Sequence, residues 1–181
     1  MNLWQPNEGI TMEQDSLFDD DDSLYIAKQK WKHTIEGDGG HCPCCGKWGK
    51  VYKLKLSQSL ALALKWIVDH GDPKSGWVDV QNKGPRWMLK SKIYPLLAHW
   101  KLIESGQKRS GIWRATTAGH AFVQGVASAF AAVYIYDNTV WAYDPEVTSF
   151  QGCFGKHFDF DELMSTRFDW SSVKLEERRK K

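Results

Sequence analysis

The sequence predicts an α+β fold, and three of its segments carry that prediction. Residues 57–71 place apolar side chains at helical spacing between a serine and a glycine, which indicates an amphipathic helix. Residues 129–143 form two β-rich apolar runs that meet at Asp137-Asn138, which is typical of a hairpin. Residues 24–56 alternate between apolar and polar side chains on both sides of a glycine-rich loop, which favours a second hairpin. Helices mixed with hairpins predict an α+β architecture rather than a parallel sheet.

Charge is distributed unevenly along the 181 residues, although the net charge is only +2. The first 22 residues carry seven acids and no Lys or Arg, whereas residues 23–116 carry 17 Lys or Arg and six acids. Residues 117–171 are acidic by five charges, and the last ten residues are basic by three. A basic central block in a nearly neutral chain predicts a polyanion-binding surface. The alternative is that these lysines merely solvate helix and strand faces.

Composition and pattern divide the chain into five expected segments. The acidic arm lacks any periodicity and is expected to be disordered. The charged end of the chain is expected to be a frayed helix or a tail. The segments are residues 1–22 (acidic arm), 23–56 (hairpin), 57–128 (helices with a strand pair), 129–171 (hairpin and short helices) and 172–181 (charged tail).

Within residues 57–128, turn residues mark where each element is expected to begin and end. Ser57 is a plausible N-cap and Gly71 a plausible end of the first helix. A short strand is expected at 77–80, and Pro85 and Pro95 are expected in the first turns of two further helices. Two strands are then expected around a polar, glycine-flanked tip, Gly106-Gln107-Lys108-Arg109-Ser110-Gly111.

The N-terminal sequence shows neither a basic region nor an apolar stretch of the kind found in signal peptides, and no run approaches the ~20 apolar residues of a membrane span. The expected location is therefore the cytoplasm. In a reducing compartment, cysteines are more often metal ligands, reactive thiols or core residues than disulfides. This context bears on the stretch His41-Cys42-Pro43-Cys44-Cys45-Gly46, which holds three of the four cysteines.

Cys42 and Cys45 fit the knuckle pattern C-P-x-C-G, in which two thiolates three residues apart converge and a glycine lets the backbone curl beneath them. Such a pair is half of a structural zinc site, so the sequence predicts zinc in a structural role. Inert cysteines or a redox-active pair remain alternatives. His33 and His41 are the nearest candidates for the other two ligands. Cys153 and His157, spaced C-x₃-H, are the alternative pair.

The segment 57–124 resembles a winged-helix DNA-binding domain. The stretch KSKIYPLLAHWKLIES is similar to the recognition helix and following strand of PadR- and MarR-type regulators, and GIWRATTAGHAF is similar to the strand and Thr-x-x-Gly turn that close their wing. Two departures are visible: Lys101 occupies the place of the usual turn glycine, and the long dimerisation helices of those regulators are lacking. A lone knuckle before a winged helix in a short chain also resembles small phage or prophage proteins, which act in a bacterial host cell.

The resemblance implies a helix in the major groove of double-stranded DNA, with polar residues on its exposed face and apolar residues behind. Basic residues at the wing tip and on the flanks would then contact phosphates. The DNA-binding residues expected on this basis are Arg86, Lys90, Ser91, Lys92, Tyr94, Lys108, Arg109 and Arg114.

The expected function is therefore non-enzymatic DNA binding, with transcription regulation as the role that the resemblance implies. No Gly-rich phosphate loop, H-E-x-x-H or G-x-S-x-G motif is present, so no catalytic residue is predicted. The alternative is a protein-interaction module, for example a phage-encoded inhibitor of a host factor, that uses the acidic arm and the acidic C-terminal third. Winged-helix scaffolds serve both kinds of function.

Overall fold

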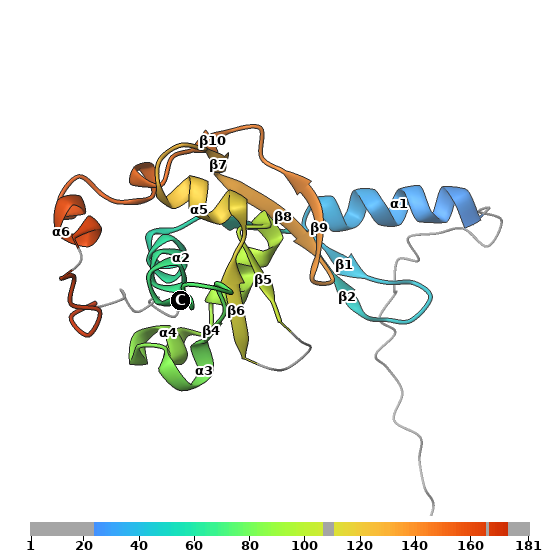
Figure 1. The fold of residues 1–181 in the computed structure, drawn as a ribbon. Helices are drawn as coiled ribbons and strands as arrows, with labels where there is room; N and C mark the ends of the chain where they lie inside the picture. The colour runs from blue at the N-terminus through green and yellow to red at the C-terminus, as the bar shows by residue number, and fades with distance from the viewer. Residues whose placement is uncertain (1–23, 107–110, 166, 174–181) are drawn as a thin grey trace, which may run out of the picture. The chain divides into compact units, whose positions relative to one another are not determined.

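A computed structural model describes residues 24–106, 111–165 and 167–173 (Figure 1). It has mixed helices and strands with small antiparallel sheets, which confirms the α+β class. The chain divides into two compact units, Met1–Val51 and Tyr52–Lys181. No helix in the described ranges has the length and apolar character needed to span a membrane.

The first unit contains a helix where the alternating pattern predicted a strand. Trp31 and Ile35 are four residues apart and therefore share one helix face, and both approach Gly49 so closely that a Cβ there would lie 2.7 Å from the Trp31 ring. The backbone N–H of Gly39 bonds the Thr34 carbonyl at 3.0 Å and ends the helix. The predicted hairpin over 24–56 is wrong because the side chains that alternate along 24–36 also fit a helical period. The unit contains α1 (Leu24–Glu36), β1 (Gly40–His41) and β2 (Trp48–Gly49), and β1 pairs with β2 in antiparallel register.

The second half of the predicted hairpin, residues 47–56, is split between the two units. Its first part is β2, and its second part is β3 (Tyr52–Lys55), which pairs not with the preceding segment but with β8 (Ala132–Tyr136). A short hairpin cannot account for this pairing, because the partner strand lies almost 80 residues further along the chain. Within the second unit β8 is the centre of a three-stranded antiparallel sheet, β3-β8-β9, with β9 at Thr139–Tyr143.

The helix predicted after Ser57 is confirmed as α2 (Gln58–His70), and it forms the centre of the core. Its residues from Leu60 to Ile67 are all buried, and the N–H of Gly71 closes the last turn on the Ile67 carbonyl. The predicted helix starts at Pro85 and Pro95 are confirmed as well, although the second of these helices is a 3₁₀ helix. The two are α4 (Arg86–Ser91) and η1 (Tyr94–Trp100), and a short helix that was not predicted, α3 (Val80–Lys83), precedes them.

A second three-stranded antiparallel sheet lies beside these helices, in the order β4-β6-β5. The strands are β4 (Val78–Asp79), β5 (Ile103–Ser105) and β6 (Ile112–Ala115), which confirms the predicted strand pair; its tip, residues 107–110, lies outside the described residues. Helix α5 (Thr117–Val123) follows β6, and the Thr116 hydroxyl accepts a bond from the Gly119 N–H at 3.1 Å. Gly119 is required here because a Cβ would lie 2.2 Å from the Leu102 carbonyl oxygen.

The remainder of the second unit packs on α2 and α5. The hairpin predicted at 129–143 is confirmed by β8 and β9, with Asp137 and Asn138 both at positive φ in the connecting turn. Phe150 and Leu163 are fully buried and anchor the C-terminal segment to the core. The elements are β7 (Ala129–Phe130), which pairs with β10 (Val147–Thr148), then η2 (Gln151–Cys153) and α6 (Phe160–Met164).

Candidate functional site

The helices α3 and α4 form a sharply bent pair because of the residues between them. The Asp79 side chain caps α3: it accepts bonds from the Asn82 side chain at 2.7 Å and from the Asn82 backbone N–H at 3.0 Å, and these bonds lower the Asp79 pKa. Gly84 follows, where a Cβ would lie 2.5 Å from the Val80 carbonyl oxygen. Pro85 then starts α4. The bend brings the side chains that end α3 and begin α4 to one surface.

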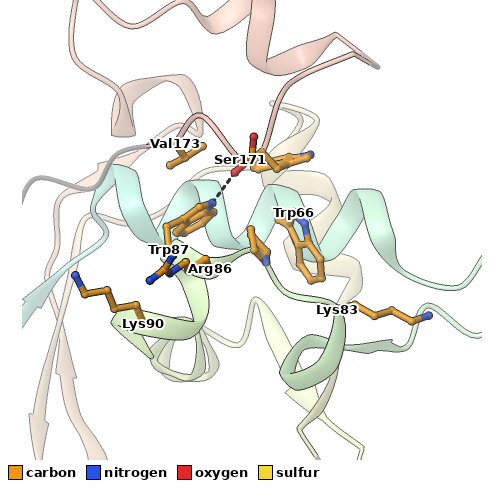
Figure 2. Close-up of a pocket in the computed structure, with 9 residues that line it drawn as sticks. Trp66, Lys83, Arg86, Trp87, Lys90, Ser171 and Val173 are labelled. Atoms are coloured by element: carbon orange, nitrogen blue, oxygen red, sulfur yellow. Dashed lines mark hydrogen bonds between the residues drawn. The ribbon is translucent and has the colours of Figure 1, made fainter.

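That surface forms one wall of a pocket of about 660 Å³ (Figure 2). Three tryptophans and three cations are among its lining residues, whereas none of the described lining residues is acidic. Ligand pockets of ~300–1,000 Å³ with an aromatic lining and a few polar groups are typical of small-molecule sites. The lining residues are Trp66, Lys83, Pro85, Arg86, Trp87, Lys90, Trp170, Ser171 and Val173.

The three tryptophans come from distant parts of the sequence and are held by specific contacts. The indole Nε1 of Trp87 donates a hydrogen bond to the Trp170 carbonyl oxygen at 3.0 Å, which ties α4 to the segment after α6. Trp66, on α2, is only 2% exposed. The His70 ring stacks on Trp66 at 4.4 Å and meets Trp170 edge-on at 6.1 Å. These contacts fix the aromatic walls before any ligand arrives.

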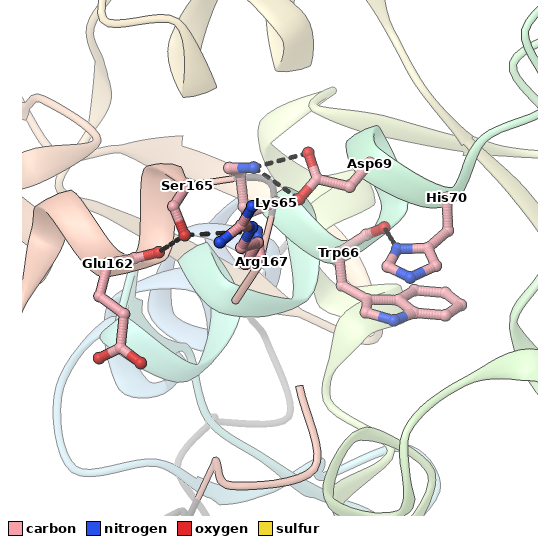
Figure 3. A network of polar contacts seen from close by, with 7 residues as sticks. All are labelled: Lys65, Trp66, Asp69, His70, Glu162, Ser165 and Arg167. Atoms are coloured by element: carbon pink, nitrogen blue, oxygen red, sulfur yellow. Dashed lines mark hydrogen bonds and ion pairs between the residues drawn. The ribbon is translucent and has the colours of Figure 1, made fainter. Parts of the chain in front are cut away.

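The polar groups near α2 are engaged within the fold (Figure 3). Lys65 is buried, and its ammonium bonds both carboxylate oxygens of Asp69 at 2.5 and 2.6 Å. After α6, the Ser165 hydroxyl donates to the Glu162 carbonyl at 2.7 Å and accepts a bond from the Arg167 backbone N–H at 3.4 Å. This turn begins the segment that reaches Trp170. Lys65 is therefore a structural cation.

Two of the predicted DNA-binding residues, Arg86 and Lys90, line the pocket. Lys92 is exposed and caps α4 in a left-handed conformation with φ of 50°. The Ser91 hydroxyl donates to the Met88 carbonyl at 3.1 Å. Residues 90–92 lie at the end of α4, because η1 begins only at Tyr94. They therefore do not face outward from the start of η1, which corrects the predicted recognition face.

The other predicted DNA-binding residues lie elsewhere. The Tyr94 ring packs edge-on against Trp113 at 5.8 Å, and burial raises the Tyr94 pKa. Arg114 stacks over the Trp77 ring at 4.4 Å and forms an ion pair with Glu104 at 2.5 Å. Both side chains therefore have partners inside the fold. Lys108 and Arg109 lie outside the described residues.

The cysteine-rich stretch forms a tight turn between β1 and β2. The Gly46 N–H bonds the Cys42 carbonyl at 2.7 Å, and Gly46 has a φ of 68°, as the knuckle pattern requires. Hydrogen bonds from the backbone of Cys44 and Cys45 lower the pKa of the Cys42 thiol, which favours the thiolate that a soft metal binds.

The structure does not bring the expected further zinc ligands together. His41 lies at the turn, but its Nδ1 is 2.9 Å from the Gly46 carbonyl oxygen, and His33 is exposed in the last turn of α1. In the second unit, burial raises the pKa of Cys153 to about 11, while His157 is exposed. Among the described residues no three His, Cys, Asp or Glu side chains are grouped as a metal site. At this turn the described residues offer the two thiols of Cys42 and Cys45, without a third ligand grouped beside them.

Sequence reasoning missed Lys83 and the three pocket tryptophans as candidate site residues. The stretch KGPRWMLK, residues 83–90, interleaves three cations with a tryptophan and could have indicated the pocket. Trp170 could not have been found in this way, because it joins Trp87 across 83 positions of sequence.

Comparisons of the chain with protein-family models, with curated proteins and with solved structures returned no match.

Proposed function

We propose that the second unit is a non-enzymatic nucleic-acid-binding domain of the winged-helix kind. Two features support this proposal. The order of elements from α2 to α5 is the order that the resemblance implies, and the β5–β6 hairpin shares its sheet with the short strand β4. The recognition helix departs from the pattern, because η1 is a seven-residue 3₁₀ helix. The proposed contact surface therefore moves from η1 to α3 and α4.

The observation that carries the proposal is the group of cations on α3 and α4. Lys83, Arg86 and Lys90 are all exposed and line one pocket without an acidic neighbour among its described lining residues. Lys92 follows at the end of α4. Cations grouped on one face attract a phosphate backbone, and each phosphate contact releases condensed counterions.

Fluorescence anisotropy with a labelled random-sequence duplex, at low and at moderate salt, tests this function. We expect binding that weakens steeply as salt rises, because the affinity depends on phosphate contacts. Absence of binding at low salt would overturn the DNA-binding proposal.

Zinc at the β1–β2 turn is a second proposal, and it depends on the two thiols of Cys42 and Cys45. The glycine turn and the lowered pKa of Cys42 support it, and its role would be to hold the tip of the turn. The described residues leave the remaining ligands unassigned.

Elemental analysis of the purified protein tests the zinc proposal. We expect about one zinc per chain, and none in the variant C42S/C45S. Either a zinc-free parent protein or stoichiometric zinc in the double variant would contradict the assignment. The single variant C153S serves as a control, because that thiol is half-buried near Ser149 and is expected to leave the metal content unchanged.

A protein-interaction role is the second candidate function. Aromatic side chains of Phe130, Trp141 and Tyr143 are each between 37% and 40% exposed, and such residues are frequent in interfaces. Alanine at Lys90, Lys92, Lys108 and Arg109 separates the two functions. DNA binding should collapse in that variant, whereas a contact made through acidic or aromatic surfaces should survive.

A further inference from the structure

The pocket between α4 and the segment 170–173 differs from a plain phosphate-binding surface. A duplex backbone needs only exposed cations, yet here the cations surround a hollow with three indole rings in its lining. Trp66 and Trp170 are connected through the His70 ring, and Trp87 is bonded to the Trp170 backbone. Rings fixed in this way are ready to stack on a flat partner at little entropic cost.

Charge restricts the chemistry of that partner. Lys83, Arg86 and Lys90 make the rim cationic, and the described lining contains no carboxylate. An arginine also matches the planar, bidentate geometry of a phosphate. A cationic rim disfavours a positively charged aromatic ligand and favours a ligand that carries a negative charge beside its ring. A ligand with a flat ring and a phosphate satisfies both parts of the site.

We propose that this pocket takes one nucleobase with its phosphate, stacked against Trp87 and Trp170 and held at the phosphate by Arg86 with Lys83 and Lys90. The volume of about 660 Å³ lies in the range of small-ligand sites. The inference deepens the proposed function, because the same cations serve both, but it requires an unpaired base. A base inside a duplex cannot enter, so the ligand is a free nucleotide or an unpaired nucleotide of a strand.

The test compares two single-stranded probes that share their phosphates and differ only in their bases. One is a labelled ten-nucleotide deoxyadenosine strand, and the other is an abasic strand of the same length. We expect the first to bind about tenfold more tightly in anisotropy measurements, as stacking of one base on an aromatic ring predicts. Equal affinities for the two strands overturn the pocket proposal, even where the duplex still binds and the proposed function stands.

A variant then assigns the effect to the pocket. W87A should remove the preference for the base-containing strand and leave the affinity for the abasic strand within about twofold, whereas R86E should weaken both. If a folded W87A protein still prefers the base-containing strand to the abasic strand, the assignment of this preference to the pocket is overturned. If W87A does not fold, W87F, which keeps a ring, should keep the preference, and the comparison of the two probes on the parent protein still decides the proposal.

Adenosine monophosphate distinguishes the two sources of the nucleotide. Competition with the ten-nucleotide strand, measured together with direct binding by calorimetry, supports a free nucleotide as the ligand. A strand that shows the base preference without such competition supports an unpaired nucleotide in nucleic acid. Both results require that the protein contacts the base itself.

Discussion

Two groups of cations in the second unit differ in what surrounds them. On the strands and on α2, Lys53, Lys65 and Arg114 each have a carboxylate partner at about 2.5 Å: Asp144, Asp69 and Glu104, respectively. On α3 and α4, Lys83, Arg86 and Lys90 line a pocket whose described walls are aromatic and contain no carboxylate. The first group belongs to the part of the unit that maintains the fold, and the second to the part that presents a surface.

The difference teaches where function is to be sought in a basic chain. A cation whose charge is already satisfied by a carboxylate gains little from an additional phosphate, since the existing partner must be displaced. Cations that line an aromatic hollow are placed where a ligand in that hollow would meet them. The excess of Lys and Arg over residues 23–116 therefore overstates the binding surface, because part of that charge is used internally.

The largest expected effect is on the stability of the fold. In G119A the new Cβ would lie 2.2 Å from the Leu102 carbonyl, which is backbone and cannot move aside easily. We expect a loss of about 3 kcal/mol in the free energy of unfolding, the upper end of the usual overpacking cost. Denaturant unfolding measures it. G155A, where nothing lies near the new Cβ, is the control, and an equal effect in both variants would contradict this packing argument.

The next effect is on binding. We expect K83A/R86A/K90A to lose at least about tenfold in duplex affinity at low salt, with the salt slope reduced by about 0.9 for each phosphate contact removed. The charge-matched control is K55A/K74A/K156A, which removes three exposed lysines that do not line the pocket. If the two triple variants bind the duplex with equal affinity, binding depends on the total positive charge of the protein. The pocket cations then have no special role in binding.

A smaller effect depends on pH. The ammonium of Lys53 and the Glu146 N–H lower the pKa of Asp144, so its charged form stabilises the folded state above the ordinary aspartate pKa of about 3.9. That stabilisation is lost as the pH falls through the lower folded-state pKa. We therefore expect D144N to melt below the parent protein at pH 7 and the gap to close below about pH 4. D137N, in an exposed turn, serves as the control; a gap that is constant with pH would rule out this linkage.

The smallest effect concerns the exposed pair of Arg114 and Glu104. Both side chains are more than 40% exposed, so the ion pair is well solvated and E104Q should cost less than about 1 kcal/mol in unfolding free energy. The stacking of Arg114 on Trp77 does not depend on Glu104. Thermal melts at low and high salt measure the effect, and a cost well above this limit would place the pair among the determinants of the fold.

Elements whose signals are local could be predicted well from the sequence. The helix after Ser57 has a nearly all-apolar interior and a glycine end, and both hairpins have turn residues between β-rich runs. The Thr-x-x-Gly turn that the resemblance predicts lies at the start of α5, and its glycine has a tertiary reason: Gly119 leaves room for the Leu102 carbonyl.

Sequence patterns gave a wrong prediction where the same spacing of apolar residues fits both a strand and a helix. Along residues 24–36 the alternation suggested a strand, and only the packing of Trp31 and Ile35 against Gly49 reveals the helix. The candidate DNA-binding residues were likewise chosen on the assumption that they lie along one helix. Instead α4 ends at Ser91 and Lys92 caps it, so these residues do not share one helix face.

By itself the sequence determined the α+β class, the central helix, the two confirmed hairpins and the supply of cations, because each depends on residues close together in the chain. The tertiary structure decided which cations are paired with carboxylates and which line a pocket. It also decided that β3 pairs with β8 and that Trp170 joins Trp87. The physical reason is that contacts across about 80 residues depend on how the core packs as a whole, and no local pattern specifies such packing.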